Sequence, residues 1–147
     1  MYGADHPRDI VERALAPVLS DRLKAFPVVV LTGARQTGKS TFARRIDPQR
    51  TYLTLDDYGV LDQALNAPDT LLSRQGPLTL DEVQRAPDLL LGIKRVVDLD
   101  RTPGRFLLTG SADLRLMQSV SETLAGRAVY VTLSPLPRRV SGPSRGG

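Results

Sequence analysis

Short apolar runs and amphipathic segments alternate along most of the chain. Five runs rich in β-branched and aliphatic residues are typical of buried strands and cover residues 27–32, 51–55, 78–81, 105–109 and 128–132. Between them, apolar residues recur at helical spacing, which predicts helices over about 40–46, 58–66, 69–74, 87–97, 112–119 and 121–126. Strands that alternate with helices predict an α/β fold, in which helices cover both faces of a parallel sheet.

The same pattern divides the chain into three parts. Residues 8–24 place apolar side chains on one helical face, so we expect residues 1–26 to form an amphipathic helix packed on the core, with Pro17 as a point where it can kink. The core then covers residues 27–134. Ser, Pro, Gly and Arg dominate residues 135–147, and this composition predicts a disordered tail.

The overall composition is that of one globular domain. The chain has 147 residues, of which 41% are apolar and 24% charged, so disorder throughout is excluded. It has no cysteine, which fits a reducing compartment and excludes a disulfide framework or a thiolate metal site. Its apolar runs are far shorter than a membrane span. We therefore expect a cytoplasmic protein without a membrane partner.

The net charge at first suggests a nucleic-acid partner. It is +4, but the three arginines of the segment after residue 134 contribute +3, which leaves +1 for the rest of the chain. A basic stripe is the usual electrostatic footprint of a protein that binds nucleic acid. A nucleic-acid partner stays open, but the charge of the core does not call for one.

One segment carries a specific chemical signal. Residues 33–40 read GARQTGKS, which matches the phosphate-binding loop pattern G-x-x-x-x-G-K-[ST] between a predicted strand and a predicted helix. Backbone N–H groups of such a loop surround phosphate oxygens, the lysine reaches the β- and γ-phosphates, and the hydroxyl binds Mg²⁺. The predicted nucleotide-binding residues are Gly33, Ala34, Arg35, Gln36, Thr37, Gly38, Lys39, Ser40 and Thr41. The predicted ligands are thus ATP and Mg²⁺, with Ser40 as a metal ligand.

Two further strands end in polar residues. Asp81 closes the run 78–81 and Glu82 follows it, and ligands of parallel sheets bind at the carboxyl ends of strands. We expect Asp81 to hold Mg²⁺, through water, and Glu82 to polarise the attacking water. Thr109 ends the run 105–109 and Ser111 follows two positions later, and either is a candidate to sense the γ-phosphate. The alternative interpretation of both segments is a solvated loop or turn after a strand.

Three segments together resemble a known family. GARQTGKS, LTLDEVQ and RFLLTGSADLRLMQSVSETLAGRA are similar to the AAA-like P-loop ATPase domain of bacterial and archaeal ATP-binding proteins. The resemblance implies a three-layer sandwich with a sheet order of 5-1-4-3-2. By position it assigns Lys39 and Ser40 to the phosphate loop, Asp81 and Glu82 to magnesium and catalysis, and Thr109 to the sensor segment.

The resemblance also assigns a role to an arginine. The family's Leu-Ala-Gly-Arg signature falls on residues 124–127, which makes Arg127 a candidate arginine finger, acting in cis or from a neighbouring subunit of a homo-oligomer. In the family a longer domain follows, and residues 136–147 do not read as its continuation. We therefore expect a truncated or frameshifted chain, which leaves turnover open.

The leading hypothesis is a Mg²⁺-dependent ATPase. The alternatives are a nucleotide-binding module or inactive remnant without turnover, and a small-molecule P-loop kinase, for which the adjacent acids Asp81 and Glu82 are less typical. A GTPase is disfavoured because no Asn-Lys-x-Asp guanine-reading motif occurs.

Overall fold

The strands form one parallel sheet in the order predicted by the resemblance. The computed structural model describes residues 7–33 and 38–133. The five strands run in the order β2-β3-β4-β1-β5, and every pair is parallel. Their bounds are β1 Val28–Gly33, β2 Thr51–Thr54, β3 Leu78–Asp81, β4 Phe106–Ser111 and β5 Ala128–Thr132. This confirms the α/β P-loop architecture and each predicted strand to within about two residues.

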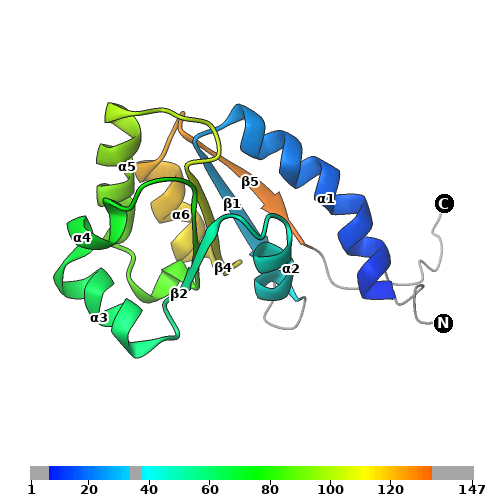
Figure 1. Cartoon of the computed structure of the whole chain (residues 1–147), viewed down its shortest axis with the longest axis horizontal. Helices are drawn as coiled ribbons and strands as arrows, with labels where there is room; N and C mark the ends of the chain where they lie inside the picture. The colour runs from blue at the N-terminus through cyan, green and yellow to red at the C-terminus, as the bar shows by residue number, and fades with distance from the viewer. Residues whose placement is uncertain (1–6, 34–37, 134–147) are drawn as a thin grey trace.

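Helices cover both faces of the sheet (Figure 1). One face carries α1 and α2, and the other carries α3, α4, α5 and α6. Their bounds are α1 Pro7–Ala25, α2 Lys39–Arg45, α3 Tyr58–Asn66, α4 Pro68–Leu72, α5 Leu89–Leu99 and α6 Leu114–Thr123. The fold is therefore a three-layer sandwich, as predicted, and Leu19 of α1 belongs to the apolar cluster of its face.

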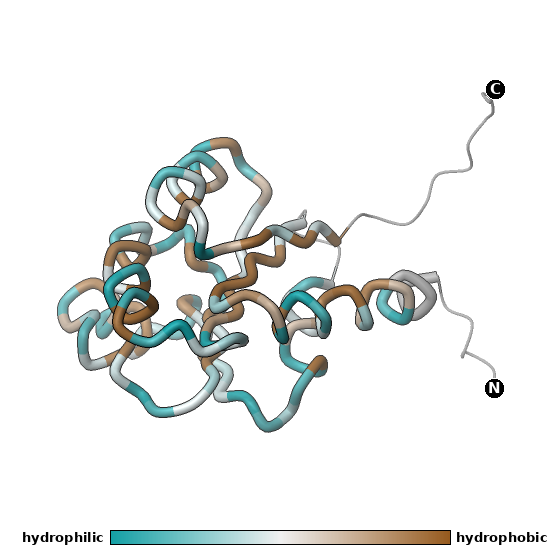
Figure 2. Tube along the Cα trace, turned by 90° about the horizontal axis from the view of Figure 1, so that it is seen from above, coloured by the Kyte–Doolittle hydropathy of each residue, from teal (hydrophilic) through white to brown (hydrophobic). Residues whose placement is uncertain are grey.

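The alternation of side chains along β1 explains the two layers. Val28 and Val30 belong to one apolar cluster, and Val29 and Leu31 belong to the other, because successive side chains of a strand point to opposite faces. All four are fully buried. Figure 2 shows hydrophobic residues concentrated along the central strands, with polar residues interspersed along the surrounding helices. A strand buried on both faces needs a continuous apolar run, which is the pattern that predicted it.

The structure differs from the sequence pattern in one expected helix pair and in one helix that was not predicted. The segments 112–119 and 121–126 do not form two helices, since a single helix α6 runs from Leu114 to Thr123. Its N-cap Asp113 accepts a hydrogen bond from the backbone N–H of Leu116, and Val120 continues the buried face. The sequence pattern also did not predict the short 3₁₀ helix η1, Val83–Arg85, directly after β3.

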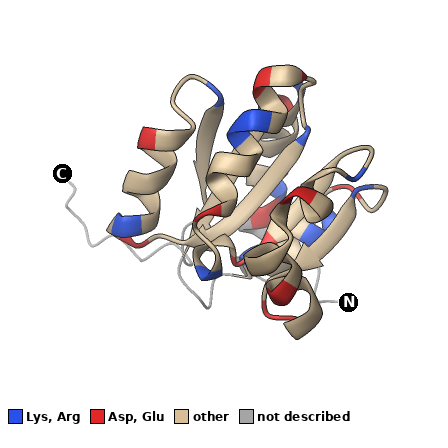
Figure 3. Ribbon diagram, turned by 90° about the vertical axis from the view of Figure 1, so that its left-hand side faces the viewer, with Lys and Arg blue, Asp and Glu red and all other residues tan. Residues whose placement is uncertain are grey.

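A buried arginine stabilises the amino end of the sheet. Arg50 is 8% exposed and donates hydrogen bonds to Thr79 Oγ1, the Leu78 carbonyl and the Gly104 carbonyl. Burial lowers the pKa of Arg50 to about 10, which leaves the guanidinium charged at neutral pH. Elsewhere, basic and acidic residues are interspersed along the helices and loops (Figure 3).

Candidate functional site

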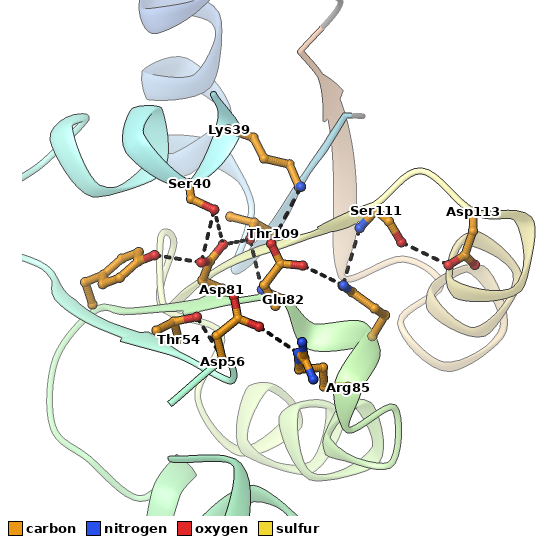
Figure 4. A network of polar contacts seen from close by, with 12 residues as sticks. Lys39, Ser40, Thr54, Asp56, Asp81, Glu82, Arg85, Thr109, Ser111 and Asp113 are labelled. Carbon is orange, nitrogen blue, oxygen red and sulfur yellow. Dashed lines mark hydrogen bonds and ion pairs between the residues drawn. The ribbon is translucent and has the colours of Figure 1, made fainter. Parts of the chain in front are cut away.

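The site lies where the carboxyl ends of four strands meet. Gly33 at the end of β1 pairs with Ser111 at the end of β4, and Asp81 at the end of β3 pairs with Thr54 of β2. Polar side chains from these strands and from α2 converge at this edge (Figure 4). The parallel topology thus brings together residues as far apart in sequence as Gly33 and Ser111, as expected for ligand sites of open α/β sheets.

The described part of the phosphate loop has the backbone that the motif requires. Gly38 precedes α2 with φ 83° and ψ 19°, a left-handed conformation that favours glycine. Lys39 follows as the first residue of α2 and is only 3% exposed. Thr41 is exposed. The predicted loop residues Ala34, Arg35, Gln36 and Thr37 lie outside the described residues.

Asp81 is the centre of the hydrogen-bond network. Its side chain is buried and accepts hydrogen bonds from three hydroxyl groups on three different elements. Ser40 Oγ lies 2.9 and 3.1 Å from the two carboxylate oxygens. Tyr52 Oη donates to Oδ2 over 2.7 Å, and Thr109 Oγ1 donates to Oδ1. A buried carboxylate is costly unless its oxygens are satisfied, and these donors satisfy both of them.

Glu82 has an unusual backbone and a cationic neighbour. It adopts φ 63° and ψ 48°, and is the one residue other than glycine with a positive φ among the described residues. Its N–H donates to Thr109 Oγ1 over 3.1 Å, which helps to hold this conformation. Its Oε2 lies 3.7 Å from Lys39 Nζ. Strained backbone clusters at functional sites, so this geometry supports the selection of Glu82 as a site residue.

Thr109 lies at the site, where its hydroxyl contacts Asp81 and Glu82. Its hydroxyl, fully buried, donates to Asp81 and accepts from the Glu82 backbone. Ser111 Oγ instead donates to Asp113, the N-cap of α6, over 2.9 Å. Both residues thus lie at the end of β4, and the sensor role stays a prediction.

Two site residues were not predicted. Tyr52 of β2 contacts Asp81, and its ring lies under the Arg44 guanidinium, whose Cζ is 4.5 Å from the ring centroid. Burial, followed by the hydrogen bond to Asp81, raises the pKa of Tyr52 to about 12. Gln84 of η1 donates to Glu82 Oε1 over 2.5 Å. The register of β2 against β3 could have suggested Tyr52, whereas Gln84 depends on the unpredicted η1 turn.

Arg127 lies at the other end of the sheet. Its carbonyl accepts from Val28 N at the start of β1, whereas the phosphate loop follows Gly33 at the end of β1. The six residues of β1 separate these ends by roughly 17 Å at the usual rise per residue. The guanidinium pairs with Asp98 over 2.6 Å, and this hydrogen bond raises the pKa of Arg127. The structure thus does not bring Arg127 to Lys39 within one chain.

The comparison with known protein families agrees with this geometry. A family model described as an AAA domain matches residues 25–139. The chain belongs to this family. The match includes the described part of the phosphate loop, the Asp81 and Glu82 acids and the end of β4, so the AAA domain contains the whole polar network.

Relatives and a solved structure extend the comparison. The chain is 40% identical over 138 residues to the uncharacterized proteins Rv2008c of Mycobacterium tuberculosis and Mb2031c of Mycobacterium bovis. The alignment covers 92% of this chain and 31% of each relative, so the chain spans about a third of their length. The Walker-type ATPase PABY2304 of Pyrococcus abyssi has a similar fold, with a TM-score of 0.56 and 18% identity over 86% of this chain and 54% of that chain.

The donor set at the site fits a magnesium ion shared with a nucleotide. Mg²⁺ is typically held by one or two protein oxygens together with phosphate and water, and Ser40 Oγ and the Asp81 carboxylate form such a pair. Among residues 7–33 and 38–133, no three His, Cys, Asp or Glu side chains group as a protein-only metal cage. In the same part of the chain, no helix has the length and apolar character needed to span a membrane.

Proposed function

We propose that this AAA domain binds ATP and, with Mg²⁺, hydrolyses the β–γ phosphoanhydride. The proposal rests on one observation, the grouping of Lys39, Asp81 and Glu82 at the carboxyl edge of the sheet. Lys39 and Asp81 are each only 3% exposed, and Glu82 is 3.7 Å from Lys39. Burying charges in this way costs stability, and such groupings are typical of functional sites.

The binding roles follow from the charge of each group. The Lys39 ammonium would contact the β- and γ-phosphate oxygens, with backbone N–H groups of the loop from Gly33 to Ser40 around them. Ser40 Oγ and Asp81 would hold Mg²⁺, which would neutralise charge on the same oxygens when bound. Ser40 Oγ has lone pairs that its O–H donation to Asp81 does not use, so it could bind the metal and still donate to Asp81.

Glu82 is the group placed to activate water. Its carboxylate would accept a proton from a water molecule as the water oxygen attacks the γ-phosphorus. The bond from the γ-phosphorus to the β–γ bridging oxygen then breaks, which releases ADP and inorganic phosphate. Lys39 stabilises the negative charge that develops on the leaving oxygen.

A nucleotide-binding module without turnover is the second candidate. It is favoured by the position of Arg127, which pairs with Asp98 at the far end of the sheet. An arginine that neutralises transition-state charge is worth about 10³ to 10⁵ in rate in related enzymes. Hydrolysis at that rate would therefore require a neighbouring copy to bring Arg127 to the site.

The two candidates are separated by binding and turnover measured on the same samples. Fluorescent ATP is titrated with and without Mg²⁺, and phosphate release is then followed over a range of chain concentrations. We expect Mg²⁺ to tighten ATP binding, Glu82→Gln to reduce phosphate release to a small residual rate while binding persists, and Lys39→Ala to lose binding. Glu122→Gln and Lys24→Met, on exposed helix surfaces, are the matched controls.

Each outcome has a distinct meaning. Binding of Mg·ATP without phosphate release from the unsubstituted chain supports the binding module. Turnover per chain that rises with concentration and falls in Arg127→Ala supports a homo-oligomer that completes the site in trans. Absence of Mg·ATP binding to the folded chain contradicts the proposal as a whole.

A further inference from the structure

The side-chain amide of Gln84 connects two parts of the site. Its Nε2 donates to Glu82 Oε1 over 2.5 Å, and its Oε1 accepts a longer hydrogen bond of 3.4 Å from the backbone N–H of Ser111. A carboxylate can only accept and a backbone N–H can only donate, so the two partners together determine which way the amide points. Gln84 therefore has one orientation that satisfies both contacts.

The local backbone explains why Gln84 returns to the residue two positions before it. The left-handed conformation of Glu82 ends β3 and starts the η1 turn, in which the N–H of Arg85 donates to the Glu82 carbonyl over 3.1 Å. Val83 within that turn is 1% exposed and packs in the apolar core. The core thus anchors the turn, and the turn presents the amide of Gln84 to the carboxylate.

The end of β4 leaves room for this amide. A Cβ atom at Gly110 would lie 3.1 Å from Gln84 Oε1 and 2.4 Å from Leu116 Cδ2, so a side chain there would crowd both groups. The φ of Gly110 is not in the left-handed region, so space and not backbone conformation is the reason for a glycine here. The close approach of β4 is what allows the Ser111 N–H to reach Gln84.

Glu82 is consequently held from two sides. Lys39 Nζ is 3.7 Å from Oε2, while Gln84 Nε2 contacts Oε1. Bound phosphate would compete with the carboxylate for the lysine, because both are anions. Gln84 carries no charge and would have no such reason to leave, so it would keep the carboxylate oriented when Lys39 turns to phosphate.

We propose that Gln84 is a positioning residue for the hydrolysis inferred above, on which this proposal rests. It holds the Glu82 carboxylate in the orientation that accepts the proton of water. It also ties that carboxylate to Ser111 at the end of β4, whose hydroxyl donates to the α6 N-cap Asp113 over 2.9 Å (Figure 4). A shift of β4 or α6 would thus move the Gln84 amide and with it change the orientation of the Glu82 carboxylate.

Kinetics test the positioning role. Gln84→Met keeps the length of the side chain but removes both hydrogen bonds, and Gln84→Glu places a second carboxylate against Glu82. Loss of a hydrogen bond to a charged group predicts a fall in turnover of roughly 10- to 100-fold for Gln84→Met, with affinity for Mg·ATP within about twofold of the unsubstituted chain. Turnover of Gln84→Glu should fall by at least as much as that of Gln84→Met. Gln118→Met, on the exposed surface of α6, is the matched control and should change neither quantity.

A double-variant comparison excludes a general structural role. If Gln84 acts through Glu82, adding Gln84→Met to Glu82→Gln should cause no further loss of turnover, because the group that it positions is gone. Additive losses, or a fall in affinity equal to the fall in turnover, would mean that Gln84 supports the fold instead and would overturn the proposal.

A spectroscopic test needs no nucleotide and no turnover. In ¹H–¹⁵N spectra of the nucleotide-free chain, the Gln84 side-chain amide signal is identified by its loss in Gln84→Met. We expect this signal to shift in Glu82→Ala while that of Gln118 does not, and an unshifted signal would overturn the contact. If the signal shifts but the unsubstituted chain releases no phosphate, the proposed hydrolysis fails and the positioning role with it. If the chain is active and Gln84→Met is equally active, only the positioning role fails.

Discussion

Tyr52→Phe is the substitution that best tests how Asp81 is held. It removes the phenol hydroxyl that donates to Asp81 Oδ2 over 2.7 Å and keeps the ring that packs under Arg44. Because Asp81 is 3% exposed, water cannot freely replace the lost donor. We therefore expect both a less stable chain and a carboxylate that is less well oriented for Mg²⁺.

The structure gives the magnitude of the stability loss. A hydrogen bond to a charged group contributes about 1.5–3 kcal/mol. Asp81 keeps its Ser40 and Thr109 donors, and Tyr52 is only half-buried, so we expect the low end, a loss of about 1.5 kcal/mol in the free energy of unfolding. For a chain of this size this corresponds to a fall in Tm of about 3–6 °C.

The pKa of Tyr52 predicts how this difference depends on pH. Burial, and then Asp81, raises that pKa to about 12 in the folded chain, against about 10 for a free phenol. The folded state therefore favours the protonated phenol. The contribution of the Tyr52 hydroxyl to the free energy of unfolding should be constant up to about pH 10 and should decline as the pH rises toward about 12. Urea unfolding of both chains across this range measures the difference directly, since all other groups are common to both.

The metal effect is measured by titrating Mg²⁺ at fixed ATP. Partners that orient a metal ligand typically contribute 10- to 100-fold to metal affinity. The Mg²⁺ concentration at which the tightening of ATP binding is half complete should therefore rise about tenfold. Tyr130→Phe is the matched control, because the Tyr130 hydroxyl bonds to the Met117 carbonyl and to Ser121, away from Asp81. It should lose stability without a change in Mg²⁺ requirement. An unchanged Mg²⁺ requirement in Tyr52→Phe, with a stability loss no larger than that of Tyr130→Phe, would refute the reasoning.

Three further predictions concern the backbone of Glu82 at the site and two polar contacts at the opposite end of the sheet. In urea unfolding, Glu82→Gly should be about 1 kcal/mol more stable than Glu82→Ala, because the residue has φ 63°, and the reverse order would show that this backbone is unstrained. Arg50→Met should cost roughly 2–4 kcal/mol, because three buried oxygens lose their donor, and a loss below about 1 kcal/mol would contradict that account. The hydrogen bond from Arg127 lowers the pKa of Asp98. The stability difference between the unsubstituted chain and Asp98→Asn should therefore be present above about pH 4 and vanish at lower pH. A difference that persists below the lowered pKa would count against the ion pair.

The strands could be predicted because burial on both faces imposes a continuous apolar run. Val28 to Leu31 form such a run, and the ends of the parallel strands then had to share one edge. The sequence pattern therefore predicted that Lys39, Asp81 and Thr109 lie close together. The residue types also indicated their chemistry, since a lysine after a glycine loop and an acid after a strand are the usual phosphate and magnesium ligands.

The remaining site residues depend on tertiary geometry that local patterns do not encode. Gln84 reaches Glu82 only because Glu82 takes a left-handed backbone, which is rare for a residue with a side chain. Tyr52 reaches Asp81 only through the register of β2 against β3. Arg127 could not be placed by its signature alone, because the signature precedes β5, whose start lies beside the start of β1.

The partners of Asp81 show how one carboxylate could both stabilise the folded chain and bind the proposed Mg²⁺. Its donors come from α2, β2 and β4, so the carboxylate joins the phosphate-loop helix to two strands of the sheet. All of them are hydroxyl groups, which can rotate to donate or to accept without moving the chain. A fixed cation in their place would satisfy Asp81 equally well but would repel Mg²⁺. Neutral, rotatable donors stabilise the buried acid and still leave the lone pairs of Ser40 Oγ for the proposed metal. The Tyr52 hydroxyl is not proposed to bind the metal. We therefore expect its removal to leave Asp81 less well oriented and to weaken Mg²⁺ binding, and not to make Asp81 more available to the metal.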